Sequence, residues 1–285
     1  MRLRDRIMLG KNEQVELIND IIETFEEYLI YVSKINLSIH DYETGLILKR
    51  LNTFCTTFSQ TVLRLVVDDS IWESEALLRS VMEGSIKLAY IACEPELITK
   101  KIFEYSHILP HINGRKRNNR IENLLNLIDL SDDTINYDIY QKILTTDLPE
   151  LDEELNKNNR KIIENRWAFN SMINTIEKCD LKEFSNTSIL SYPYGMMSHI
   201  VHMDCDGLNF MWERFERDEI DRTMVNTAQI GRQLFDIYNL MFLRILSLCL
   251  IYKTDYKDLI ELRRSHKNII ERIQVFSTSF EESYK

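Results

Sequence analysis

Glycine and proline are scarce in this sequence, which has only seven glycines and four prolines among 285 residues. Tight hairpin turns depend on these two residue types, so a fold built from many short strands is disfavoured. Hydrophobic residues make up 44% of the chain and recur at helical spacing almost throughout, and no run alternates convincingly between apolar and polar. The sequence therefore predicts an all-α fold, with residues 1–285 forming a single multi-helix bundle.

Basic charge is also in short supply, because 35 Lys and Arg residues face 45 Asp and Glu residues, for a net charge of −10. Such a surface is a poor match for duplex DNA or an anionic membrane, and neither is expected as a partner. One dense basic run interrupts the pattern, formed by Arg115, Lys116, Arg117 and Arg120. Two interpretations stay open for it: a solvated surface segment, or a local patch that binds RNA or a nucleotide.

The cysteines form no recognisable framework, because five of them are scattered along the chain with no C-x-x-C pair. This spacing argues against structural disulfides and against a thiolate zinc site, and it favours a reducing compartment. The first residues, MRLRDRIMLGKNEQ, lack the apolar stretch of a signal peptide. We therefore expect a cytoplasmic protein.

One apolar segment, residues 237–252, is a candidate membrane span. The segment IYNLMFLRILSLCLIY is shorter than the usual minimum of roughly 18 residues. Arg244 also lies in its middle. These features predict a buried helix in a soluble core rather than a membrane helix.

The helices can be placed from apolar periodicity and from breaks in it. The polar, acidic stretch 131–154 is expected to be a mobile connection. Helices are expected at about residues 13–32, 42–67, 71–93, 158–179, 219–252 and 256–277, with a further helix within residues 191–207 and shorter helical stretches between 95 and 130.

Sequence motifs for common cofactors are missing, since neither a P-loop nor a G-x-G-x-x-G pattern occurs. No cofactor is predicted. A metal site formed by His199, His202, Asp204 and Asp206 is an alternative, but His199 points about 60° away from His202 and the helix offers no glutamate at ligand spacing. The sequence thus favours metal-independent chemistry.

The helix expected at 71–92 carries charge where apolar residues are expected. It is apolar on two sides, yet Arg79 and Glu83 fall among Trp and Ile residues and are four residues apart, close enough to touch. Buried charges must be paired or face water. Either the two residues form a packing ion pair, or Arg79 lines a cavity as a phosphate donor oriented by Glu83. Glu75 and Lys87 are expected to form a solvated rim.

A second concentration of polar groups lies in SYPYGMMSHIVHMDCDG, residues 191–207. On a helix, Tyr194, Ser198 and His202 share one face, whereas Met196, Ile200 and Met203 are expected to pack inward on the other. His202 is a candidate general acid or base, with Ser198 and Tyr194 as hydrogen-bonding partners. A core histidine satisfied by its neighbours is the alternative. The glycine of MDCDG is expected to end this helix.

Three short motifs resemble those of an uncharacterised bacterial family, a domain of unknown function found in small all-helical proteins. They are the R-x-x-x-E of LLRSVMEGSIKLAYI, the following FEYS, and the late Y-x-x-x-S-x-x-V-H. The resemblance covers about residues 55–250. It implies the same five site residues: Arg79, Glu83, Tyr194, Ser198 and His202.

More distantly, the chain resembles the HEPN group of helical ribonucleases and nucleotide-binding proteins of bacterial defence and toxin systems. That group uses an arginine and a histidine four to six residues apart on one helix, usually paired across a dimer. Here no histidine has an arginine at that distance upstream, so the chain departs from the HEPN pattern. Arg79 and His202 would rebuild the pair only if their two helices meet.

These observations leave two functional hypotheses. In the first, the chain is a metal-independent phosphodiester-cleaving or nucleotide-binding protein, with His202 transferring a proton and Arg79 stabilising phosphate charge. In the second, it is a non-catalytic interaction or regulatory module in which the same five residues form a buried structural network. The long apolar helices near the C-terminus would then form a homodimer interface.

Overall fold

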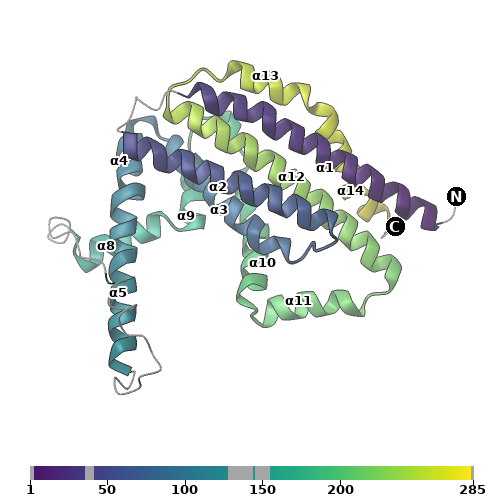
Figure 1. The fold of residues 1–285 in the computed structure, drawn as a ribbon, viewed down its shortest axis with the longest axis horizontal. Coiled ribbons are helices and arrows are strands. Elements are labelled where there is room, and N and C mark those ends of the chain that lie inside the picture. The colour runs from purple at the N-terminus through teal and green to yellow at the C-terminus, as the bar shows by residue number, and fades with distance from the viewer. Residues whose placement is uncertain (1–2, 36–41, 128–143, 145–154, 284–285) are drawn as a thin grey trace. The chain divides into compact units, whose positions relative to one another are not determined.

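The chain is all-α in the computed structural model, which describes residues 3–35, 42–127, 144 and 155–283 (Figure 1). No strand occurs in these ranges, which confirms the predicted fold class. The acidic stretch 131–154 lies outside the described residues except for Leu144, so its expected mobility stays a prediction. The helices are α1 (Leu3–Lys34), α2 (Tyr42–Val67), α3 (Ser74–Ala92), α4 (Ile98–Phe103), α5 (Leu109–Leu127), α8 (Lys157–Arg166), α9 (Phe169–Ile176), α10 (Ser191–His202), α11 (Cys205–Glu216), α12 (Glu219–Ile251), α13 (Lys257–Ser265) and α14 (Lys267–Ser283), with short 3-10 turns at Pro95–Leu97, Lys182–Phe184 and Thr187–Leu190 and a π-helical turn at Glu104–Ile108.

The contacts divide the chain into two compact units, one formed by residues 1–95 and 172–285 and the other by residues 96–171. We refer to them as unit 1 and unit 2. Two compact units can belong to one domain, so the single domain expected from the sequence stays a prediction.

Unit 1 is built around the long helix α12. In Figure 1, α12 runs beside α1 and α2, and it also packs against α3 and α14. Its apolar side chains Leu234, Ile237 and Ile245 are fully buried. Burial of this continuous apolar surface is the main force that holds the unit together.

The segment that resembles a membrane span is the centre of this core. Among the described helices, α12 alone is long and apolar enough to cross a membrane, but 83% of its most apolar window is buried inside the chain. Arg244 is fully buried and donates hydrogen bonds to Asn52 Oδ1 at 3.2 Å and to Ser85 Oγ at 3.1 Å. The prediction of a core helix is confirmed. The apolar face that was expected to support a homodimer is therefore covered by the chain itself, and the dimer stays a prediction.

Two expected helices are interrupted at residues with distant partners. The expected helix 256–277 breaks into α13 and α14 at His266, whose ring bonds to Glu27 at 2.8 Å and to Tyr238 at 3.2 Å. The expected helix 158–179 breaks at Trp167, whose indole N–H donates to Glu104 at 3.0 Å. In both places tertiary hydrogen bonds accompany a break that local apolar spacing did not indicate.

Unit 2 contains α4, α5 and α8. The buried Glu104 accepts hydrogen bonds from Arg166 at 2.8 Å and from Trp167, which stacks on Tyr105. Ile108, Ile112 and Leu155 form a small apolar cluster beside this network. The basic run therefore lies on α5 in unit 2.

Candidate functional site

The candidate site lies in unit 1, where α10 packs against α3. Helix α3 also packs on α2 and α12, and its apolar residues Leu78, Met82 and Ile86 are fully buried. This packing fixes the rotation of α3 and places Arg79 and Glu83 at the edge that meets α10. Met197, which is 1% exposed, is the buried apolar residue of α10.

Arg79 is the centre of the site. Its Nε donates to Ser198 Oγ at 2.9 Å, and its Nη2 donates to the Tyr194 hydroxyl at 2.9 Å. The guanidinium carbon also lies 4.6 Å from the centroid of the Tyr194 ring, within cation-π range. The structure thus brings Arg79 of α3 together with Tyr194 and Ser198 of α10.

Glu83 belongs to the same cluster but is held mainly by Lys87. Lys87 Nζ donates to Glu83 Oε1 at 2.7 Å, whereas Arg79 Nη1 is 4.0 Å from Glu83 Oε2. The Tyr194 hydroxyl donates to Glu83 Oε2 over a longer 3.4 Å. We call Arg79, Glu83, Lys87, Tyr194 and Ser198 the Arg79 cluster.

The charges in the Arg79 cluster set the protonation of its members. Partial burial alone would raise the pKa of Glu83, but the Lys87 ammonium, the Arg79 guanidinium and the Tyr194 hydrogen bond together lower it below its usual range. Burial, together with the Glu83 carboxylate, raises the pKa of Tyr194. At neutral pH the cluster thus holds two cations, one carboxylate and a neutral phenol, for a net charge of +1.

The Arg79 cluster is partly open to water. The side chains of Arg79, Lys87 and Glu83 are 22%, 24% and 33% exposed. A sealed packing network would bury these groups, so the cluster can meet a ligand from solution. Gly195 lies beside Tyr194 on α10, and a Cβ at its position would meet open space.

His202 stands apart from the Arg79 cluster. It is the last residue of α10, is exposed, and makes no hydrogen bond or ion pair within the part of the chain that the structure describes. It lies one helical turn beyond Ser198 on the same face of α10. The structure thus joins four of the five predicted site residues and leaves His202 at the rim.

The end of α10 differs from the expectation. Met203 ends the helix in the left-handed conformation (φ 49°) and is 75% exposed, so its expected inward packing is wrong. Gly207 does not end α10 but lies inside α11, where Asp204 accepts a hydrogen bond from its N–H at 3.0 Å. A Cβ at Gly207 would lie 2.3 Å from His199 O, so glycine is needed there for α10 and α11 to pack this closely.

Ligand atoms of His199, Asp204 and Asp206 lie within 4.8 Å of one another, so these three residues have the spacing of a metal site. All three are exposed. His199 Nδ1 already bonds to Asp204 Oδ2 at 2.6 Å, and Asp204 caps α11. These contacts give His199 and Asp204 a structural role at the α10–α11 junction.

The four basic residues proposed to bind substrate lie on α5, in unit 2, whereas the Arg79 cluster lies in unit 1. Lys116 forms an ion pair with Glu164 of α8. Arg115 and Arg117 also have interactions within the chain. Arg120 is exposed.

A second polar network, which the sequence reasoning missed, lies between α3 and α12. Glu75 is 1% exposed and accepts hydrogen bonds from Gln229, Arg232 and Gln233, so its expected place on a solvated rim is wrong. Arg232 also pairs with the buried Asp236 at 2.7 Å. The available signal was the i, i+4 spacing of Arg232 and Asp236 beside the apolar stretch of α12. Lys87 is also expected on the rim, but it pairs with Glu83 at the same i, i+4 spacing.

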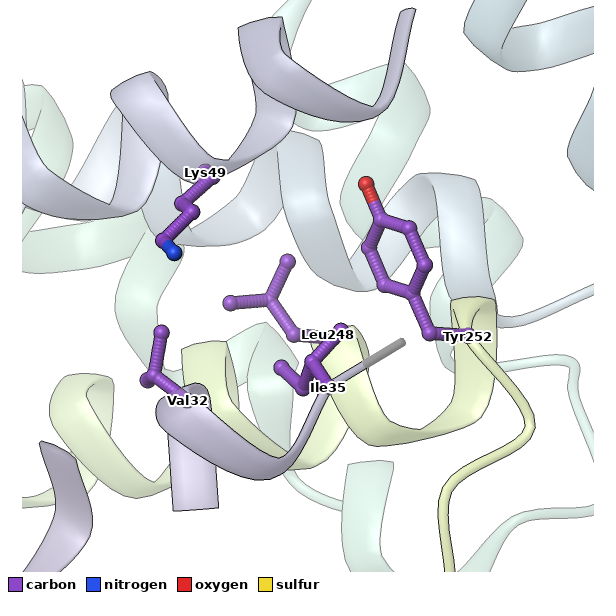
Figure 2. A pocket seen from close by; sticks show the side chains of 5 residues that line it. All are labelled: Val32, Ile35, Lys49, Leu248 and Tyr252. Carbon is purple, nitrogen blue, oxygen red and sulfur yellow. The ribbon is translucent and has the colours of Figure 1, made fainter. Parts of the chain in front are cut away.

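A small apolar hollow lies elsewhere in unit 1, between α1, α2 and α12 (Figure 2). It is lined by Val32, Ile35, Lys49, Leu248 and Tyr252, and Lys49 is its charged member. The Tyr252 hydroxyl donates to Gly45 O at 2.8 Å. None of the predicted site residues lines this hollow.

One family model matches the chain. The model of a family of unknown function, DUF5677, matches residues 46–220, more than half of the 285 residues. The chain belongs to the DUF5677 family. This confirms the resemblance to an uncharacterised family. No curated protein and no solved structure matches the chain.

The DUF5677 region contains both helices of the candidate site. It includes α3, α10 and α11, and it therefore contains all five residues predicted from the sequence together with Lys87. It ends at residue 220, so most of α12 lies outside it. The Arg79 cluster is thus complete within the DUF5677 region.

Proposed function

We propose that the Arg79 cluster binds a phosphate group of a nucleotide or of RNA. One observation carries the proposal. Arg79 Nε and Nη2 are oriented by two neutral hydroxyls, while Nη1 lies 4.0 Å from Glu83 and makes no hydrogen bond within the described part of the chain. A guanidinium held in this way is pre-oriented and keeps donor capacity for an anion.

The other members of the Arg79 cluster complement a phosphate. Lys87 adds a second positive charge, and it also neutralises Glu83, which would otherwise repel an anion. The Tyr194 and Ser198 hydroxyls are hydrogen-bonding groups for phosphate or ribose oxygens. Because these groups come from two packed helices, a ligand meets a rigid rather than a mobile site.

His202 supplies the chemistry in the catalytic form of this proposal. An exposed imidazole one turn from Ser198 can accept the proton of a ribose 2′-hydroxyl as the oxygen attacks the adjacent phosphorus. The products of that step are a 2′,3′-cyclic phosphate and a released 5′-oxygen, which takes a proton from solvent water. Arg79 would stabilise the negative charge on the phosphate. The reaction needs no metal ion.

The basic residues of α5 have a supporting role in this proposal. The chain carries a net charge of −10, so RNA must be attracted locally. Arg115, Lys116, Arg117 and Arg120 provide such a local patch.

A reducing, cytoplasmic setting accords with five free cysteines, three of them buried. A role in a bacterial defence or toxin system is implied only by the HEPN resemblance.

A second candidate function rests on the same contacts. The hydrogen bonds of Arg79 to Ser198 and Tyr194 join residues more than 100 positions apart, which is also what a network that specifies packing would do. In this case the chain is an interaction or regulatory module without catalysis. The two functions differ in the effect of Arg79 on stability and on ligand binding.

The test is an RNA cleavage assay without metal. Total RNA is incubated in EDTA with the wild type, Arg79→Gln and His202→Ala, and with Arg264→Gln as a matched control. Arg264 is exposed and makes no hydrogen bond or ion pair in the described part of the chain. The catalytic form predicts cutting by the wild type and the control, and at least a hundredfold loss in both site variants.

Three results would oppose all or part of the proposal. If no protein cuts RNA and Arg79→Gln binds nucleotide and RNA as well as the wild type does, phosphate binding is wrong. If His202→Ala cuts normally, His202 has no part in proton transfer. If RNA is bound in an Arg79-dependent manner but is not cut, phosphate binding holds and the catalytic form is rejected.

A further inference from the structure

Helix α11 exposes a stripe of large apolar side chains. Leu208, Trp212 and Phe215 are 56%, 65% and 69% exposed. Their i, i+4, i+7 spacing puts all three on one face of the helix. Single exposed apolar residues are ordinary on protein surfaces, but a contiguous stripe of this kind marks an interaction site.

The inner face of α11 is held firmly, so the outward position of the stripe is a property of the fold. The Arg214 guanidinium lies between the rings of Trp72 and Phe210, 3.5 Å from the Phe210 centroid. The two rings themselves meet edge to face at 5.9 Å. On the same side, Gly207 packs closely on the backbone of α10.

Apolar exposure continues beyond both ends of α11. Met203, just before the helix, is 75% exposed, and Ile220, just after it, is 51% exposed. We call Met203, Leu208, Trp212, Phe215 and Ile220 the α11 face. A helix of this length spans about 18 Å, the length of three to four turns of a partner helix.

Acidic side chains surround the α11 face. The exposed carboxylates in this part of the chain are Asp204, which pairs with His199, and Asp206, Glu213, Glu216, Asp218, Glu219 and Asp221. Basic groups are fewer and are engaged by the chain itself: Arg217 pairs with Glu213, and Arg222 donates to the carbonyl oxygens of Phe215 and Arg217. The surroundings of the α11 face are therefore negative.

The negative charge around the α11 face determines which kind of partner can bind there. An anionic membrane or an RNA strand would be repelled. A second copy bound through the same face would bring two acidic surfaces together, because a two-fold interface pairs each patch with itself. A partner with an apolar stripe flanked by Lys and Arg would instead bury the aromatic side chains and pair with the carboxylates.

We propose that the α11 face docks a basic amphipathic helix of a partner protein. Trp212 and Phe215 are the anchors. The exposed carboxylates of Glu216, which also accepts the Trp212 indole N–H at 2.8 Å, and of Glu219 are available to the partner's basic residues. This inference is independent of phosphate binding at the Arg79 cluster. The close contact at Gly207 joins α11 to α10, so docking occurs on the helix next to the one that carries Tyr194 and Ser198.

The test uses two 14-residue model peptides with a leucine face, one with lysines and one with glutamates at the remaining positions. Binding to the full chain is measured by calorimetry for the wild type, Trp212→Gln and Phe215→Gln. Phe54→Gln is the matched control, since Phe54 is 63% exposed on α2. We expect the lysine peptide to bind the wild type and the control and to bind the two α11 variants at least tenfold more weakly. Binding should also weaken as salt rises.

Several outcomes of these experiments would contradict the docking proposal. The proposal fails if the lysine peptide does not bind, or if the glutamate peptide binds equally well. It also fails if sedimentation shows that the wild type dimerises and Trp212→Gln does not, because the occupant is then a second copy. Trp212-dependent binding to vesicles of anionic lipid would identify a membrane as the occupant and would reject a protein partner.

Discussion

Arg79 Nε donates a hydrogen bond to Ser198 Oγ at 2.9 Å, and this bond joins two helices across 119 residues of sequence. Tyr194, one turn earlier on α10, accepts the other hydrogen bond of the same guanidinium. The two hydroxyls therefore share one donor group. The predictions below follow from this arrangement and from the packing around it.

Ser198→Ala and Tyr194→Phe should be coupled in their effects on stability. Each removes one hydrogen-bond acceptor of Arg79 and should lower the free energy of unfolding by about 1 kcal/mol. Because both acceptors orient one guanidinium, the double variant should differ from the sum of the single variants by at least about 0.5 kcal/mol. Urea unfolding of the four proteins measures this. Simple additivity would mean that the two hydroxyls do not act on Arg79 together.

Glu75→Gln should be far more destabilising than a change at a surface glutamate. Glu75 is 1% exposed and accepts hydrogen bonds from Gln229, Arg232 and Gln233. The change removes one of the two carboxylates that pair with Arg232 and leaves these donors without a charged acceptor, at a cost of about 3 kcal/mol. Glu73→Gln is the matched control, because Glu73 is exposed and its side chain makes no capping bond. Chemical unfolding should separate the two. Equal stabilities would show that Glu75 does belong to a solvated rim.

Asp236 should make stability fall as pH rises from about 4 to about 6. Burial raises the pKa of its carboxyl to about 6, although Arg232 opposes this. In that window the unfolded carboxyl ionises and the folded one does not, so the unfolded state gains about 3 kcal/mol. Above pH 6 both states are ionised and the effect is constant.

The measurement for Asp236 is the pH dependence of unfolding in the wild type and in Asp236→Asn. Surface carboxyls contribute equally to both proteins, so the difference between the two curves isolates Asp236. We expect the wild type to lose stability relative to the variant between pH 4 and 6. A difference that stays constant with pH would contradict the raised pKa.

Gly207→Ala and Gly195→Ala should have opposite effects. A Cβ at Gly207 would meet the backbone of His199, which cannot move aside without separating α10 from α11, so we expect a loss of about 2 kcal/mol. A Cβ at Gly195 would meet open space, and replacing glycine within a helix should add about 0.5–1 kcal/mol. Thermal unfolding compares the two. Two stabilised variants would contradict the close packing of α10 on α11.

The sequence predicted well those features that depend on local spacing. The bounds of α2 match the expectation of residues 42–67, because apolar periodicity determines them. Four members of the candidate site were chosen on the same basis, since i, i+4 spacing puts Arg79 near Glu83 and Tyr194 near Ser198. Spacing alone could not show that these two pairs meet.

The failures depend on partners that are distant in sequence. Local spacing places Glu75 on a solvated rim, because its partner Arg232 is 157 residues away in the sequence. The break between α13 and α14 coincides with hydrogen bonds of His266 to Glu27 and Tyr238, which no local pattern indicates. Met203 adopts the left-handed conformation at the end of α10, a position that glycine usually occupies. Asp204 is the N-cap of α11, so Gly207 lies within that helix and cannot end α10.

The most direct test of the account is the affinity of the wild type and Arg79→Gln for ATP and for a single-stranded RNA oligonucleotide, measured by calorimetry in EDTA alongside the melting temperature. If the Arg79 cluster is a phosphate site, both ligands bind the wild type, and the variant binds them at least tenfold more weakly while it stays folded and melts no more than about 5 °C lower, the shift expected for two lost hydrogen bonds. If affinities are equal, or if neither ligand binds and the variant melts several degrees lower, the cluster is a packing network and the proposed function is contradicted.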